Sequence, residues 1–246
     1  MSLARRPFLA LAALALVPVA RGAHAAETLV RGSGVAATQR RDVGAFAGVG
    51  LGAPFAVVLR PGPREAIEIV ADDNIVALVQ TTVRGSGGDR SLQIDLPRET
   101  RVEPRTPIVV TIDYVRLEDL AVGGSGSISA RSMKAEKLEA AIGGSGKIDL
   151  ADLDAGRLVV AIGGSGTLRA DGRARTLSVS IGGSGRCDAE RLVAGDVSVS
   201  VAGSGDTRVR AETTLRASIA GSGDVYHGGA AMPQAAVVGS GRLKRI

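Results

Sequence analysis

The chain has 246 residues, with 30 Lys and Arg against 25 Asp and Glu, and a formal net charge of +5. Three of the basic residues, Arg5, Arg6 and Arg21, belong to an N-terminal stretch without acids, so removing it leaves 27 against 25, a charge of +2. So small a charge does not indicate a nucleic-acid partner. Cys187 is the only cysteine, which excludes an internal disulfide.

Residues 1–25 have the three parts of a secretory signal peptide: a basic start, an apolar run over residues 8–20, and small residues before a cleavage point at Ala26. We therefore expect an exported protein, in the periplasm or at the cell surface. Arg-Arg-Pro-Phe-Leu at residues 5–9 resembles a twin-arginine signal, so that route and the general secretory route both stay open. No later segment has the about 20 apolar residues of a spanning helix, so we expect no transmembrane segment in the mature chain.

The stretch between the signal peptide and residue 118 has two parts. Residues 26–40 are small and polar and are expected to be flexible. Residues 41–118 alternate apolar and polar positions, which predicts longer strands that start the repeat region and cap its N-terminal end. Within them, Asp72–Gln80 is expected to form one short helix with an acidic N-cap, because its apolar residues fall on one face.

Over residues 119–246 the tripeptide Gly-Ser-Gly recurs at a nearly constant spacing. The intervals between its serines are 20, 20, 19, 20, 18 and 18 residues, and the serines are Ser125, Ser145, Ser165, Ser184, Ser204, Ser222 and Ser240. A flexible linker of this composition has no reason to hold a period, whereas a structural repeat does.

Apolar residues occupy alternate positions on both sides of each serine. The position three before it is Val or Ile in every repeat, and the positions five before, three after and five after are mostly apolar. This alternation indicates strands with one buried face, which they can bury only by stacking coil on coil. The sequence therefore predicts an all-β fold: a single domain, residues 41–246, forming a right-handed parallel β-solenoid with about one coil per repeat and a rise of about 4.8 Å.

The glycines of each corner are predicted to lie where the backbones of successive coils approach too closely for a side chain, often with positive φ. The serines would form a ladder along one edge and could hydrogen-bond between coils. A phosphate-binding loop is not indicated, because no helix follows the motif and no Lys-Ser or Lys-Thr completes it.

Two outward columns flank the serines. The column four residues after them is expected to form an ion-pair ladder of alternating sign on the surface, and consists of Ser129, Asp149, Arg169, Asp188, Arg208, Tyr226 and Lys244. Each exposed pair would contribute only about 0.2 to 1 kcal/mol. Toward the end of the chain, Lys244 and Arg245 are the charges expected to discourage strand addition to the last coil.

The column four residues before the serines is the candidate interaction face, and consists of Ala121, Ala141, Ala161, Ser180, Ser200, Ser218 and Ala236. We call it the small-residue face. Its side chains are too small to enclose a small molecule, but they permit close approach by another sheet, strand or polymer. The alternative is a surface covered by this chain's own N-terminal segment.

No residue set indicates catalysis, and we expect no cofactor and no metal. His227 stands in a mostly apolar column, which favours a buried or end-coil histidine over a general base. Cys187 occupies an inner position without a nearby base, and is interpreted as a core residue. Asp72 and Asp73 could hold a cation with Asn74, but a helix cap is the preferred interpretation.

Four features together resemble the head GIN domain described for bacterial autotransporter adhesins, a domain of unknown function. They are the stretch GAFAGVGLGAPFAVVLRPG, the segment VADDNIVALVQTTV, the strand SLQIDL and the serial Gly-Ser-Gly corners. The resemblance covers about residues 41–245. It implies an exported β-solenoid with an adhesin-like role, and it carries no catalytic residues that could be transferred.

The first hypothesis for function is a non-catalytic, adhesin-like or scaffolding module that binds an envelope protein or a surface polymer, or another copy of itself. A structural, self-associating envelope protein is the close alternative. A polysaccharide-active solenoid enzyme ranks lower, because arginines separate the acids of the outward column. Aromatic platforms for glycans are also sparse, with four aromatic residues after residue 25: Phe46, Phe55, Tyr114 and Tyr226.

Overall fold

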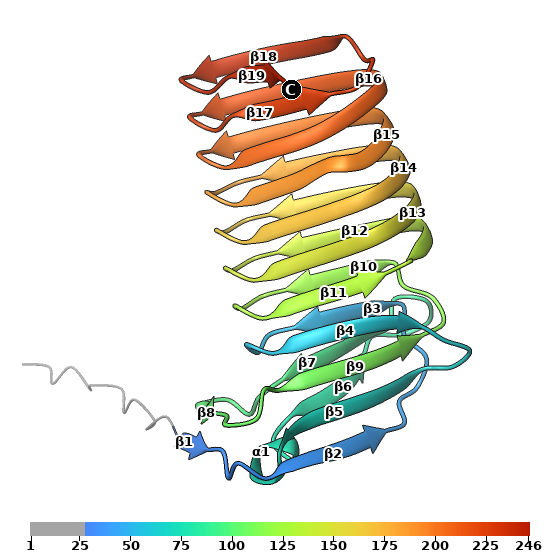
Figure 1. Ribbon diagram of the computed structural model, residues 1–246, viewed down its shortest axis with the longest axis vertical. Coiled ribbons are helices and arrows are strands. Elements are labelled where there is room, and N and C mark those ends of the chain that lie inside the picture. Colours follow the sequence, from blue (N-terminus) through green and yellow to red (C-terminus); the bar gives the residue numbers. More distant parts are fainter. Residues whose placement is uncertain (1–27) are drawn as a thin grey trace, which may run out of the picture.

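A computed structural model describes residues 28–246, and the expected signal peptide lies outside them. The described chain is a tall stack of β coils on a smaller group of N-terminal strands (Figure 1). Within this part of the chain, no helix is long and apolar enough to cross a membrane. The prediction of an all-β parallel solenoid is confirmed.

Each coil of the repeat region consists of two strands that meet at a Gly-Ser-Gly corner, and the corners line up along one edge, at left in Figure 1. We call the strands that run into the corners the entering sheet and those that run out of them the leaving sheet. The elements are β10 (Asp119–Val122), β11 (Ser127–Arg131), β12 (Lys134–Ile142), β13 (Lys147–Ile162), β14 (Thr167–Ile181), β15 (Arg186–Gly203), β16 (Asp206–Gly221), β17 (Val225–Gly228), β18 (Pro233–Gly239) and β19 (Leu243–Arg245).

The longest strands lie in the repeats, where β13 to β16 run from the leaving sheet around a bend into the entering sheet. The apolar alternation seen in the sequence covers only the five residues on either side of each serine and leaves this bend out. The alternation of buried and exposed residues continues through it, with Leu153 and Ala155 buried in β13, so the strand does not end there.

The core consists of the predicted inner columns, stacked in register. Val160 pairs with Val179, and Val179 with Val199. All four inner columns are buried in the first six repeats, whereas their last members, in β18 and β19, are not. Each fully buried Val, Leu or Ile contributes about 1.5 to 3 kcal/mol, so the columns supply most of the driving force for stacking.

Backbone hydrogen bonds connect each corner to the corner of the preceding coil. The N–H of Ser145 donates to the carbonyl oxygen of Gly124 at 3.1 Å, and that of Ser165 to Gly144 at 3.1 Å. The same bond recurs at Ser184, Ser204, Ser222 and Ser240. The ladder that connects the corners is therefore made by the serine amides, while the side chains are exposed.

The N-terminal strands start the solenoid and then close its end. The elements are β1 (Thr28–Arg31), β2 (Ala36–Arg41), β3 (Gly48–Leu51), β4 (Ala56–Pro61), β5 (Ala66–Asp72), α1 (Asp73–Val76), β6 (Gln80–Arg84), β7 (Ser91–Asp95), β8 (Thr100–Glu103) and β9 (Val109–Tyr114). Strands β3 and β4 pair in parallel with β10 and β11 and form a coil below them. Beyond them, β5 pairs antiparallel with β9, and β2 antiparallel with β5. The antiparallel strands end the repeat of coils.

Three expectations for this region are wrong. The strands of residues 41–118 are shorter than those of the repeats, because they do not continue around the bend. Residues 28–40, expected to be flexible, form β1 and β2, which are fixed by backbone pairing with β8 and β5. The helix expected over Asp72–Gln80 is the single turn α1, since Asp72 belongs to β5 and Gln80 to β6.

The corner glycines permit a matched test of the close approach between coils. A Cβ on Gly164 would lie under 3.0 Å from two backbone carbonyl oxygens of the preceding corner, whereas a Cβ on Gly163 would meet nothing within 4 Å. We predict that Gly164→Ala lowers the free energy of unfolding by about 1 to 3 kcal/mol, and that Gly163→Ala changes it by less than about 0.5 kcal/mol. Urea unfolding followed by circular dichroism measures both. Equal effects at the two positions would contradict a sterically closed corner.

Candidate functional site

The small-residue face follows the entering sheet from β10 to β18. Backbone pairing places its members opposite one another without a shift: Ala141 pairs with Ala161, Ala161 with Ser180, and Ser180 with Ser200. All seven side chains are exposed. Because the coils hold one register, the column is straight, and because no side chain is larger than serine, it is flat.

A second exposed column, which the sequence analysis did not identify, widens this face. It lies two residues before each serine and consists of Gly123, Gly143, Gly163, Gly182, Ala202, Ala220 and Val238. The same column-by-column comparison of the repeats would have found it, since every member but the last is Gly or Ala. With the exposed corner serines, the surface is three columns of small residues wide.

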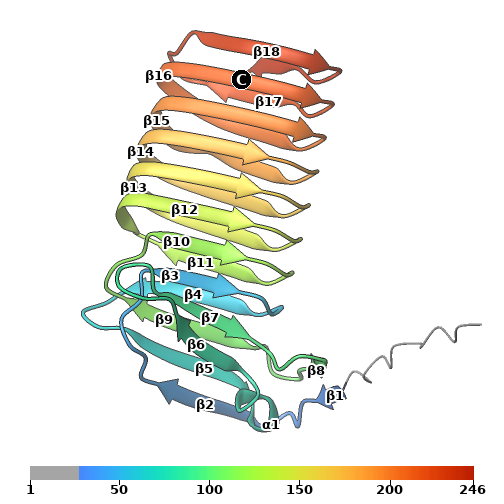
Figure 2. The ribbon, with the colours of Figure 1, turned by 180° about the vertical axis from the view of Figure 1, so that it is seen from behind.

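No segment of residues 28–246 lies over this face. Strands β1 and β2 are at the N-terminal end of the stack, far from β13 to β18 (Figure 2). The alternative that the N-terminal segment covers the small-residue face is therefore not supported by any residue the structure describes.

The outward column of the leaving sheet has the expected register but not the expected ion pairs. Asp149 pairs through the backbone with Arg169, Arg169 with Asp188, and Asp188 with Arg208. Among the described residues, none of these three adjacent pairs forms a salt bridge. The ion-pair ladder is thus wrong as a prediction, and the backbone hydrogen bonds fix the register of the coils.

The charged side chains of the leaving sheet make other contacts. Arg186 approaches Asp206 at 3.7 Å in the neighbouring column. Tyr226 lies between two cations, with the Arg208 guanidinium 4.9 Å and the Lys244 ammonium 5.2 Å from its ring centre. Tyr226 is the only aromatic residue in positions 119–246. Because both cations lie against its ring, the ring is not free to stack on a sugar.

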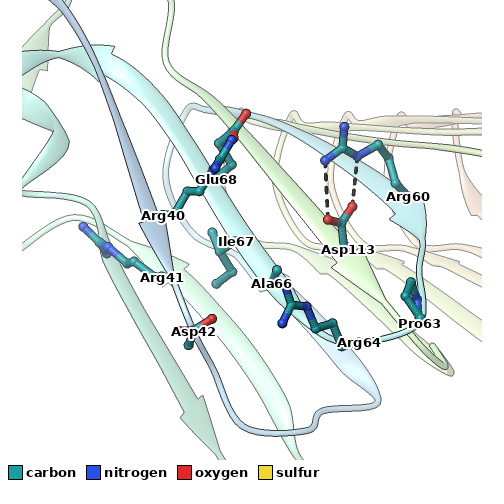
Figure 3. Close-up of a pocket in the computed structure, with 10 residues that line it drawn as sticks. All are labelled: Arg40, Arg41, Asp42, Arg60, Pro63, Arg64, Ala66, Ile67, Glu68 and Asp113. Carbon is teal, nitrogen blue, oxygen red and sulfur yellow. Dashed lines mark hydrogen bonds and ion pairs between the residues drawn. The ribbon is translucent and has the colours of Figure 1, made fainter.

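A hollow of about 310 Å³ lies beside β2, β4 and β5 near the N-terminal end (Figure 3). Four of its charged side chains form two ion pairs, Arg40 with Glu68 and Arg60 with Asp113, each at 2.9 Å. Arg41 points away from the Arg60–Asp113 pair, and donates to the carbonyl oxygen of Val76 at 3.1 Å instead. The arginines connect the strands of the cap, β2 with β5 and β4 with β9.

Asp72 is a structural carboxylate. It is fully buried, and accepts hydrogen bonds from the backbone N–H groups of Gly34, Arg105 and Thr106 and from the Thr106 hydroxyl. Burial by itself would raise its pKa, but these donors outweigh burial and hold the pKa below its usual value. Its side chain makes no cap bond to α1, so the helix-cap interpretation is wrong for Asp72.

The neighbours of Asp72 do not form a cation site. Asp73 accepts a hydrogen bond from the Ser33 hydroxyl, and the Asn74 side-chain oxygen accepts one from the Ser33 N–H. Across residues 28–246, no group of three or more His, Cys, Asp or Glu side chains is arranged to hold a metal.

Cys187 is fully buried in the core, and burial, with a smaller effect of Asp188, raises the pKa of its thiol to about 12. A thiol in this state is not a nucleophile at neutral pH. His227 is 5 % exposed, and its Nδ1 has no hydrogen-bond partner. Both residues are core side chains, as the sequence analysis preferred.

The buried histidine predicts a pH dependence of stability. Burial, with a smaller effect of Arg245, lowers the pKa of His227 from 6.5. The unfolded chain therefore binds a proton below about pH 6.5 that the folded chain does not, and the free energy of unfolding falls as the pH drops through that range. His227→Leu should remove this part of the dependence. Urea unfolding of both proteins between about pH 7.5 and 5.5 measures it, and parallel profiles would contradict the assignment.

Residues 45–231 match the sequence profile of the family described as "Putative auto-transporter adhesin, head GIN domain". A crystal structure of a "putative adhesin" from Bacteroides fragilis superposes with a TM-score of 0.81 at 23% identity, covering 88% of this chain and 100% of that one. No curated protein matches the sequence.

Two further crystal structures share the fold. A "putative adhesin" from Parabacteroides merdae gives a TM-score of 0.66 at 21% identity, covering 89% of this chain and 99% of that one. A "putative lipid binding protein" from Parabacteroides distasonis gives 0.70 at 19% identity, covering 89% and 100%. At these identities the likeness shows the fold alone.

Proposed function

Because the chain belongs to the family described as "Putative auto-transporter adhesin, head GIN domain", we propose that it is an exported, non-catalytic interaction module of the cell envelope. It binds an envelope protein or an extended surface polymer along the small-residue face. Residues 1–25 direct its export and are removed, which places the mature chain in the periplasm or on the cell surface.

The observation that carries the proposal is the exposed small-residue face, which continues in register from β10 to β18. Ala and Gly lose no side-chain entropy on binding, so a partner that binds along this face causes little loss of conformational entropy in the chain. A sheet or an extended chain can approach the backbone closely over many coils. Affinity would then come from the length of the contact.

Other functions have less support in the geometry. The small-residue face has no cation, so it offers nothing to a nucleic-acid backbone. It also has no large apolar side chain that could insert into a lipid layer, which weighs against adopting the lipid-binding description of one structural neighbour. In the described region, neither Cys187 nor His227 is accessible for catalysis.

Self-association is the second candidate. Two copies could pack their small-residue faces together, since each face is flat and free of charge in the column from Ala121 to Ala236. A structural role of this kind would give assemblies that persist at high salt without any ligand, because no ion pair would be involved.

A retention experiment tests the proposal. Purified chain beginning at Ala26 is incubated with cell-envelope fractions and recovered by affinity pull-down. The double variant Ala161→Arg/Ser200→Arg places two long charged side chains on the face, two coils apart, and should reduce retention about tenfold or more. Sedimentation velocity of the same samples reports self-association.

The matched control is Ser127→Arg/Thr167→Arg, which adds the same charges two coils apart on the leaving sheet. This control should be retained like the unsubstituted chain, and thermal melting should show all three proteins folded. Retention that is unaffected by the first variant, or no retention by any fraction, would overturn the proposal.

A further inference from the structure

The C-terminal end of the solenoid exposes its apolar core. Strand β18 is exposed along all seven residues. Its inward residue Val237 is 43% exposed, whereas Ile219, its partner one coil below, is 1% exposed. Met232 and Val238 add 84% and 74% exposed side chains at the same end. No described segment covers this cross-section of the core.

The opposite end of the stack is closed. There β5 runs antiparallel to β9, β2 pairs with the other edge of β5, and the inward side chains of β5, including Ile69 and Ala71, are fully buried. The two ends are therefore not equivalent, and the open one is available for docking (Figure 1).

The open end also has unpaired strand edges. Among the described strands, β18 pairs only with β16, and β19 only with β17. The second edge of each strand has free N–H and C=O groups, which an added strand can pair with. No charged residue interrupts β18, whose sequence is PQAAVVG.

The basic residues expected to protect this end lie on β19 and not on β18. Lys244 lies on β19, where its ammonium pairs with Asp224 at 2.5 Å and lies over Tyr226. Arg245 donates to the carbonyl oxygen of Gly229 and makes no salt bridge with a described residue. Neither side chain stands on β18.

The charges around the open end favour an acidic partner strand over a second copy of the chain. Arg242 and Arg245 have no carboxylate partner among the described residues, because Asp224 is held by Lys244 and Glu212 by Arg210. A second copy docked end to end would bring its own Arg242 and Arg245 to the same interface, and like charges would repel. A strand with acidic residues would instead compensate them.

We propose that the open C-terminal end is a docking site for an extended partner segment that alternates apolar and acidic residues and adds as a strand to β18 and β19. Its apolar side chains cover Val237 and the core below, and its carboxylates lie on the outward side, where Arg242 stands. This site lies on the end of the stack and shares only Ala236 with the small-residue face, so it does not depend on the function proposed for that face.

The test uses two labelled peptides long enough to run along β18, the corner and β19 (Pro233–Arg245), one that alternates valine and glutamate and one that alternates valine and lysine. Fluorescence anisotropy with the chain beginning at Ala26 measures binding. The valine–glutamate peptide should bind about tenfold more tightly than the valine–lysine peptide. Equal affinities, or no binding of the first peptide, would overturn the proposal.

Two variants locate the site. Val237→Asp should abolish binding of the valine–glutamate peptide, whereas Val193→Asp should retain it; Val193 is a valine of nearly equal exposure, 42%, at the bend of β15. Arg242→Glu should remove or reverse the preference for the valine–glutamate peptide. If Val237→Asp and Val193→Asp behave alike, or if sedimentation shows a dimer of the unsubstituted chain that Val237→Asp dissociates, the assignment to an acidic partner strand is wrong.

Discussion

The close approach of successive backbones at the Gly-Ser-Gly corners is the constraint on which the other features depend. A Cβ at Gly144 or Gly164 would collide with the carbonyl oxygens of the corner below. The approach brings the serine amide within hydrogen-bond distance of that corner, 3.1 Å at Ser165. In the last repeats the corner also needs positive φ, as at Gly203 and Gly221, which glycine adopts without strain.

A fixed corner fixes the surface as well as the core. Once each coil repeats the position of the one below, every inward residue joins a buried column and every outward residue an exposed one. The small-residue face and the open C-terminal end are two consequences of this stacking. The first is a side of the stack, and the second is the place where stacking stops. A solenoid thus offers a partner a long flat side or an unpaired edge, and it offers few enclosed cavities.

The sequence was enough to predict the features of the fold that recur in every coil, but not those that occur only once. The spacing of Ser125, Ser145 and Ser165 was enough to predict the coils, the buried columns and the register of the outward ones. Contacts that occur at a single place in the fold cannot be predicted from the spacing of a repeat. The buried Asp72 clamp depends on Gly34 and on the 104–106 loop, far apart in sequence. The ion-pair ladder failed because register aligns backbones, whereas an ion pair also requires suitable side-chain conformations.

Backbone hydrogen exchange at the corners tests the central claim most directly. If the corners are hydrogen-bonded between coils, the amides of Ser145, Ser165 and Ser184 should exchange as slowly as those of the flanking strands, because exchange requires coils to separate. Peptides from β18 should exchange faster, since that strand has a neighbour on one side only. Corner amides that exchange at the rate of an unstructured peptide, between protected strands, would show that Gly-Ser-Gly is a linker and would contradict the account.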